Sequence, residues 1–223
     1  MLLAGFGDSI TAAQYLPEED AFLTRLGKRY GLPVLNAGIP GNTSEQGLRR
    51  MAKDVLAYHP DLCIIAFGMN DHTAVGPNQA KVPISRYKYY LTEMVRHCKA
   101  QHCIPVLCTV QPVIAGNQCQ YYYARHPQEW YRHPIGVQAW INEYSRAVRE
   151  VAAEQDVLIA DIAYSFRLAR YAGIPLSCLV RTIENSGIDD GVHPNAAGHE
   201  LYERCIAGVL DLVVCLLKKK HQR

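Results

Sequence analysis

Short apolar runs alternate with longer amphipathic stretches along the chain. The apolar runs cover residues 2–6, 33–35, 62–67, 104–110 and 157–162. The stretches between them repeat apolar positions with helical spacing, over about residues 17–29, 43–58, 85–101, 136–155 and 195–217. Apolar strands that alternate with helices are typical of a parallel sheet covered on both faces. The pattern therefore predicts a three-layer α/β/α fold with a doubly wound, mainly parallel sheet of about five strands.

Local signals and chain length refine this picture. Thr43 and Gln46 have the spacing of a capping box at the start of a helix, and Pro194 stands where a first helical turn tolerates proline. The 223 residues, 49% of them hydrophobic, suffice for one well-buried domain and are few for two. We therefore expect a single domain over residues 1–223, with one unusually long connection at about 111–136.

Polar residues and glycine follow three of the predicted strands. Ser9 comes directly after the first apolar run, Gly38 follows the second and Asn70 the third. Because ligands of open α/β sheets bind beyond the carboxyl ends of the strands, these three loops should converge on one site. Glycine lets backbone approach a substrate closely, and an asparagine amide can donate to a developing alkoxide without titrating. The placement favours catalysis at this edge.

A serine, a histidine and a carboxylate with compatible chemistry lie at the two ends of the chain. A serine hydroxyl is a poor nucleophile unless a neutral imidazole takes its proton as it attacks. His193 suits that role, because Asp190 precedes it by three residues and can reach one ring nitrogen within a single turn. The other ring nitrogen is then able to face Ser9, with Asp189 as a spare carboxylate. These residues predict nucleophilic acyl transfer.

Four sequence blocks occur in a fixed order along the chain. They are GDSIT at 7–11, NAGIPGNTS at 36–44, FGMND at 67–71 and DGVHPNAAGH at 190–199. Each block alone also fits a turn or a helix cap. Together, in this order, they make the chain resemble the SGNH hydrolases, also called the GDSL esterase and lipase family, over nearly its whole length. The resemblance implies a flavodoxin-like SGNH hydrolase fold and a serine esterase.

The resemblance also implies a role for each residue of the site. Ser9 would be the nucleophile, His193 the general base and Asp190 the group that orients the histidine. The oxyanion hole would consist of the backbone N–H of Ser9 together with Gly38 and Asn70.

The long connection at 111–136 is rich in aromatic residues and should emerge at the same edge of the sheet. Long connections there often form walls over a site, although the rings also fit packing on the scaffold or an oligomer contact. His72, beside Asn70, fits either a place in the cleft or an exposed position. The candidate substrate-binding residues are Asp8, Ile39, His72, Tyr122, Tyr123, Trp130 and Tyr131.

The residues favour a carboxylic ester hydrolase without a metal or other cofactor. Asp8, Asp71, Asp190 and His193 could together ligate a hard metal ion, which would indicate a phosphoesterase, but we expect no metal. No phosphate-binding loop and no dinucleotide fingerprint occurs. We expect short-acyl esters of a small or carbohydrate-like alcohol as substrates. A thioesterase, a lysophospholipase and a catalytically silent ligand-binding domain are the alternatives.

Charge, cysteines and the chain ends bear on partners and location. A net charge of +2 without a dense basic stripe gives no reason to expect nucleic acid as a partner. The eight cysteines include no CxxC pair, and no signal peptide is visible, so we expect reduced thiols and a cytoplasmic protein. The apolar stretch at 210–217 before three lysines fits a packed final helix better than membrane association. The oligomeric state stays open, a homo-oligomer included.

Overall fold

A five-stranded parallel sheet forms the centre of the molecule. The computed structural model describes residues 1–221. The strands stand in the order β2-β1-β3-β6-β7 and cover Leu3–Gly7 (β1), Val34–Gly38 (β2), Leu62–Ala66 (β3), Ile104–Cys108 (β6) and Leu158–Ala160 (β7). Every neighbouring pair is parallel, and Gly7 lies beside both Gly38 and Ala66. The predicted α/β sheet is confirmed.

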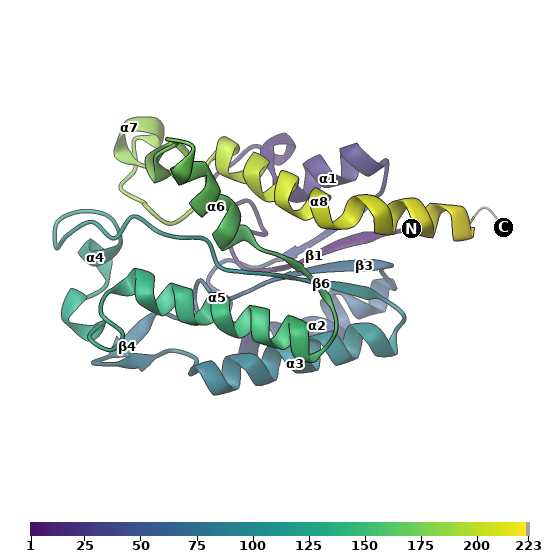
Figure 1. Ribbon diagram of the computed structural model, residues 1–223, viewed down its shortest axis with the longest axis horizontal. Helices are drawn as coiled ribbons and strands as arrows, with labels where there is room; N and C mark the ends of the chain where they lie inside the picture. Colours follow the sequence, from purple (N-terminus) through teal and green to yellow (C-terminus); the bar gives the residue numbers. More distant parts are fainter. Residues whose placement is uncertain (222–223) are drawn as a thin grey trace.

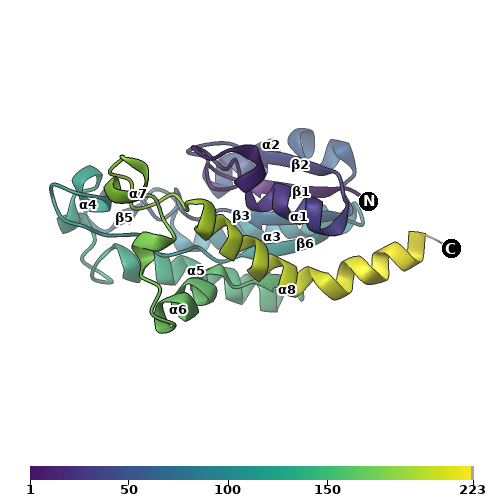
Figure 2. The same cartoon turned by 90° about the horizontal axis from the view of Figure 1, so that it is seen from above.

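Helices cover both faces of this sheet, as Figure 1 and Figure 2 show. One face carries α1 and α8, with α6 packed on α8, and the other carries α3 between α2 and α5. These helices cover Phe22–Tyr30 (α1), Ser44–Asp54 (α2), Ile84–Ala100 (α3), Val137–Glu154 (α5), Ile162–Tyr171 (α6) and Ala196–His221 (α8). The arrangement is the three-layer, flavodoxin-like one, in which the winding reverses between β1 and β3. That reversal opens a crevice at the carboxyl edge of the sheet.

The sequence explains why these elements form. Side chains of the central strands, such as Leu3, Phe6 and Ile64, are fully buried because helices cover the sheet on both sides. The predicted capping box starts α2: Thr43 accepts from the Gln46 backbone N–H, and the Gln46 side chain accepts from the Thr43 N–H.

Several shorter elements interrupt the long loops. A two-stranded antiparallel hairpin, β4 (Ala74–Gly76) and β5 (Gln79–Ala80), follows β3. The short helices are α4 (Tyr122–Arg125), α7 (Ile183–Ser186), η1 (Glu18–Asp20), η2 (Leu56–Tyr58), η3 (Gln128–Trp130) and η4 (Leu176–Cys178). The pattern of apolar positions did not predict the hairpin, α4 or α7, because they are too short to show a period. It did not predict α6 either, which begins at Ile162, the last residue of the apolar run at 157–162.

One predicted helix boundary is wrong. Pro194 does not lie in the first turn of α8, which begins at Ala196. Asn195 stands between them, and its side chain accepts a hydrogen bond from the Gly198 N–H at 3.0 Å. The helix therefore starts from an asparagine cap that follows the proline.

The structure also places the cysteines and the long final helix. The eight cysteines carry free thiols, and four of them are buried in or beside the core. Within residues 1–221, no helix is both long and apolar enough to cross a lipid bilayer. Leu210 and Val214 of α8 pack into the core, whereas Leu212 and Leu216 are exposed on its other side.

Candidate active site

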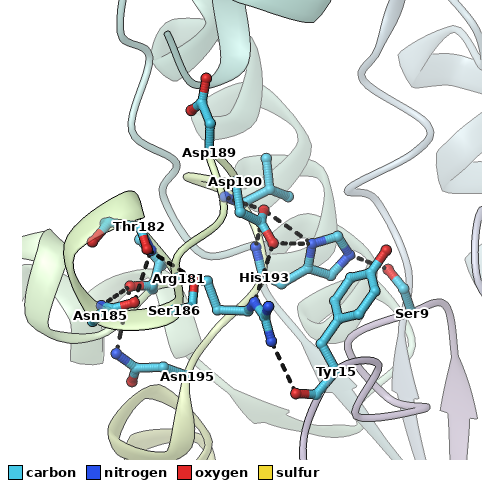
Figure 3. A network of polar contacts seen from close by, with 12 residues as sticks. Ser9, Tyr15, Arg181, Thr182, Asn185, Ser186, Asp189, Asp190, His193 and Asn195 are labelled. Atoms are coloured by element: carbon cyan, nitrogen blue, oxygen red, sulfur yellow. Dashed lines mark hydrogen bonds and ion pairs between the residues drawn. The ribbon is translucent and has the colours of Figure 1, made fainter.

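Ser9, His193 and Asp190 form a continuous hydrogen-bonded chain (Figure 3). Ser9 lies two residues beyond β1, and the other two lie in the loop before α8. The distance from Ser9 Oγ to His193 Nε2 is 3.0 Å, and the distance from His193 Nδ1 to Asp190 Oδ2 is 2.9 Å. The imidazole therefore stands between hydroxyl and carboxylate, as proton transfer from the serine requires.

The loop between Asp190 and His193 is folded around its own carboxylate. The backbone N–H groups of Val192 and His193 donate to Asp190 Oδ1 at 3.0 and 3.1 Å. Gly191 makes the turn with a φ of +72°, a conformation that favours glycine. Burial raises the pKa of Asp190, but the hydrogen bond and charge of His193 and the two backbone donors outweigh burial and hold this pKa below its usual value. Asp190 is therefore ionised at neutral pH.

The predicted oxyanion donors lie beside Ser9 and already have hydrogen-bond partners in this structure. Asn70 Nδ2 is 3.0 Å from the carbonyl of Asn42 and 3.2 Å from Asp8 Oδ2, and the Gly38 N–H donates to Asn36 Oδ1 at 3.0 Å. A Cβ on Gly38 would lie 2.3 Å from the Ala12 nitrogen, so only glycine fits there. To bind an oxyanion, each donor must exchange or share its present acceptor.

Two buried carboxylates support the loop that carries Asn70. Asp8 is 2% exposed, and it accepts from the Ile10 N–H and from Asn70. Burial raises the pKa of Asp8 to about 7 and that of Asp71 to about 6, and their mutual repulsion adds to the shift at Asp8. Asp71 accepts from both the backbone and the hydroxyl of Ser44, which ties this loop to the start of α2. The prediction that Asp8 contacts substrate is wrong, because its carboxylate is buried against Asn70.

A cavity of about 540 Å³ opens over Ser9, Asn70 and His193. Its walls include Tyr15, Thr73, Lys81, Arg125, His126 and Ile188. The Arg125 guanidinium donates to the backbone carbonyls of Asp189 and Asp190, so α4 is joined to the loop that carries the histidine. Asp189 accepts from the Tyr121 N–H at 2.7 Å and does not contact His193. The Asp189 carboxylate thus anchors the connection at 111–136 through its hydrogen bond with Tyr121.

Most of the aromatic candidates lie behind the cavity. His72 is completely buried, and Tyr123 and Tyr131 are 8% and 2% exposed. Tyr122 lines the cavity, but its hydroxyl points to His72 Nε2 at 3.1 Å and to the Tyr131 hydroxyl at 2.8 Å. Trp130 and Ile39 are not among the lining residues. The prediction of substrate contact is therefore wrong for the buried His72, Tyr123 and Tyr131, whereas for Tyr122, Trp130 and Ile39 it stays a prediction.

The buried aromatic side chains instead anchor the long connection to the loop after β3. His72 Nδ1 lies 3.1 Å from the Gly68 carbonyl, and the Tyr131 hydroxyl accepts from the Ala74 N–H at 3.0 Å. Burial lowers the pKa of His72 to about 4, so the ring is neutral at physiological pH. Connection and loop thus form one hydrogen-bonded unit beside Asn70.

No site for a metal ion is visible in the described part of the chain. Among residues 1–221, no three His, Cys, Asp or Glu side chains are grouped so as to hold one. The four residues considered above as possible metal ligands already form hydrogen bonds within the protein: Asp8, Asp71, Asp190 and His193.

Comparison with known protein families agrees with this geometry. The model of the GDSL-like lipase/acylhydrolase family matches residues 6–201, a stretch that contains all four sequence blocks. The chain belongs to that family. Members of the GDSL family are serine hydrolases that act on carboxylic esters, so the substrate class is a small-molecule ester.

Individual relatives of this GDSL protein are distant. It is 29% identical to an uncharacterised lipoprotein of Bacillus subtilis over 71% of this chain and 69% of the relative. It is 26% identical to an acetylxylan esterase of Geobacillus stearothermophilus, over 89% of this chain and 88% of that enzyme. The solved lipase/acylhydrolase of Enterococcus faecalis has the same fold, with a TM-score of 0.70, 24% identity and 94% of each chain covered. The cytoplasmic location stays a prediction.

Sequence reasoning missed several residues of this GDSL site. Tyr15, Lys81, Arg125 and His126 line the cavity, and Arg181 contacts Asp190 from behind. Tyr15 alone had a signal, since it follows Ser9 by six residues. The others reach the site only through the tertiary fold.

Proposed function

We propose that this GDSL hydrolase cleaves carboxylic esters through a seryl acyl-enzyme formed on Ser9. The observation that carries the proposal is the 3.0 Å contact between Ser9 Oγ and His193 Nε2, with Asp190 on the opposite ring nitrogen. Asp190 fixes the tautomer in which Nδ1 bears the proton, so Nε2 is the free base toward the hydroxyl.

The reaction then follows from the positions of these groups. Ser9 Oγ attacks the ester carbonyl while His193 Nε2 takes its proton, and the carbonyl oxygen becomes an oxyanion. The Asn70 amide, with the backbone N–H groups of Gly38 and Ser9, stabilises that charge. His193 gives the proton to the leaving alcohol, and a water molecule attacks the acyl-enzyme with the same base.

The alcohol part of the substrate is the second element of the proposal, and we assign it to small or carbohydrate-like alcohols with short acyl groups. The cavity walls support this, because Thr73, Lys81 and Arg125 bring polar groups close to Ser9. The relative in Geobacillus stearothermophilus is named an acetylxylan esterase, which favours the same class.

The test is a panel of chromogenic acyl esters and thioesters, including acetylated sugars, combined with fluorophosphonate labelling. Acetyl esters of sugars should give the highest kcat/KM, and the phosphonate should label Ser9. Ser9→Ala should lose both activity and label, while chelators should leave wild-type activity unchanged. A preference for thioesters or lysophospholipids would reassign the substrate, and a protein that binds acylated ligands without turnover would reject catalysis.

A further inference from the structure

Arg181 is a buried charged residue that the proposed mechanism does not use. It lies just before α7 and is 8% exposed. Its backbone runs beside the loop that carries the histidine: the Arg181 N–H donates to the His193 carbonyl at 2.8 Å, and the Gly191 N–H donates to the Arg181 carbonyl at 2.8 Å. The backbone of Arg181 therefore fixes this loop from both ends.

The guanidinium of Arg181 contacts two different parts of the site (Figure 3). Its Nε lies 3.6 Å from Asp190 Oδ2, and its Nη1 donates to the Tyr15 carbonyl at 2.9 Å. The same guanidinium lies over the Tyr15 ring, 4.7 Å from its centroid. Within residues 1–221, Arg181 Nε is one of two buried side-chain polar atoms without a hydrogen-bond partner. This N–H faces the carboxylate at a distance that a small movement converts into a hydrogen bond.

Tyr15 links this guanidinium to the histidine. Tyr15 lies in the segment after Ser9, and its φ of +73° is rarely adopted by a side chain of this size. Its ring meets the His193 imidazole edge to face, with centroids 5.3 Å apart and an angle of 90° between the planes. The Arg181 hydrogen bond to the Tyr15 carbonyl helps to hold this unfavourable backbone in place.

We propose that Arg181 is a positioning residue for the esterase reaction, and that together with Tyr15 it holds Asp190 and His193 in line with Ser9. This inference rests on the proposed function. Ser9 and His193 are 184 residues apart in sequence, and their hydrogen bond depends on the alignment of two separate loops. Arg181 makes contact with both loops, through Tyr15 on one side and Asp190 on the other.

Arg181→Ala should therefore lower kcat by about 10- to 100-fold with little change in KM, because the reacting groups lose alignment while the cavity stays open. The rate of fluorophosphonate labelling at Ser9 should fall by the same factor. Arg181→Lys should recover only part of the loss, since lysine supplies charge but not the fork that reaches two acceptors. Low-millimolar guanidinium should partly restore Arg181→Ala.

The pH profile separates this role from simple stabilisation. The charged and titratable groups around His193 include Asp190 in its own loop, Arg181 beside that loop, Asp8 beyond Ser9 and His199 in α8. Further such groups line the same cavity: Lys81, Arg125, His126 and Asp189. The charge of Arg181 lies 3.6 Å from the Asp190 carboxylate and so acts directly on the catalytic pair. Its removal should therefore shift the acidic limb of kcat/KM to higher pH.

Arg149→Ala is the matched control. Arg149 also binds a partly buried aspartate, Asp161, through two hydrogen bonds of 2.9 Å, but away from the cavity. This variant should lose stability and keep kcat and the pH profile. In a double-mutant cycle, Arg181→Ala with Tyr15→Ala should cost less than the product of the two single effects.

Three outcomes would overturn the proposal. One is an Arg181→Ala enzyme that melts at a lower temperature but keeps kcat and its acidic limb. Another is full independence of the Arg181 and Tyr15 effects. If Arg181→Ala does not fold, Arg181→Lys with unchanged kcat and pH profile would count equally against it. Failure of the proposed function would look different, because wild-type protein would then show neither turnover nor label at Ser9.

Discussion

Asp8→Asn should stabilise the protein at alkaline pH while it lowers activity. Asp8 is buried beside Ser9, and burial raises its pKa from 3.8 to about 7. The folded state therefore binds the proton of Asp8 more tightly than the unfolded state does. Ionisation of this group costs stability progressively as pH rises from about 4 to about 7, and above that window the cost is constant.

The size of the effect follows from the shift. A rise of roughly three pKa units corresponds to about 4 kcal/mol at pH 8. Asparagine removes this cost and can still accept from the Ile10 N–H, but it loses the carboxylate oxygen that accepts from Asn70. An unsatisfied buried donor costs about 1–3 kcal/mol. The net gain at pH 8 should therefore be about 1–3 kcal/mol. Near pH 4, where Asp8 of the wild type is protonated in the folded state, only the cost of the unsatisfied donor remains, so the variant should there be about 1–3 kcal/mol less stable than wild type.

Chemical unfolding of wild type and variant between pH 4 and pH 8 measures this difference. Asp71→Asn is the companion variant, because Asp71 has a pKa near 6 and its effect should be complete at lower pH. In the same samples, kcat of Asp8→Asn should fall, since Asn70 loses its anionic partner. Parallel stability curves for wild type and Asp8→Asn across this range would refute the reasoning, because Asp8 would then titrate equally in both states.

Four further predictions follow from the site. Asp190→Asn should lower kcat by about 10⁴-fold, the effect known for a serine protease, with little change in the circular dichroism melting curve; near wild-type turnover would contradict an orienting role. Asn70→Ala should lower kcat by about 10²- to 10³-fold in steady-state assays, and a change confined to KM would place it on the ground-state substrate instead. Tyr122→Phe should lower the unfolding free energy by about 1–3 kcal/mol, since it removes the link between His72 and Tyr131, while the ratio of kcat/KM for acetyl and butyryl esters stays fixed. Lys81 lines both the active-site cavity and a neighbouring cavity of about 560 Å³. Lys81→Ala should therefore lower kcat/KM more for acetylated oligosaccharides than for acetylated monosaccharides. Equal losses for the two substrates would argue against a substrate that spans both cavities.

The central sheet could be predicted because buried parallel strands are apolar on both faces. Each predicted run overlaps a strand of the sheet, as at 62–67, where β3 covers Leu62–Ala66. The residues at the carboxyl ends of these strands could be predicted as part of the site because the strands run parallel. Once the strands are parallel, Ser9 and Asn70 must emerge at one edge.

The parts that could not be predicted depend on contacts between distant segments. Composition alone does not show which rings of the 111–136 connection face inward. His72 and Tyr131 are buried because each forms a hydrogen bond with the other segment, His72 with the Tyr122 hydroxyl and Tyr131 with the Ala74 N–H. Arg181 reaches Tyr15 across 166 residues of sequence. No local period or motif carries that information.

Several features that lower the stability of this fold lie at the carboxyl edge of the sheet, around the proposed catalytic residues. Asp8 and Asp71 are buried close enough to repel each other, Tyr15 adopts a positive φ, and Arg181 Nε has no hydrogen bond. Each feature lowers stability, and each contacts a residue of the proposed reaction or its loop. Substitutions that relieve them should therefore stabilise the protein and slow the enzyme together. Relief of similar strain far from this edge, for example at the positive φ of His59, should change stability alone.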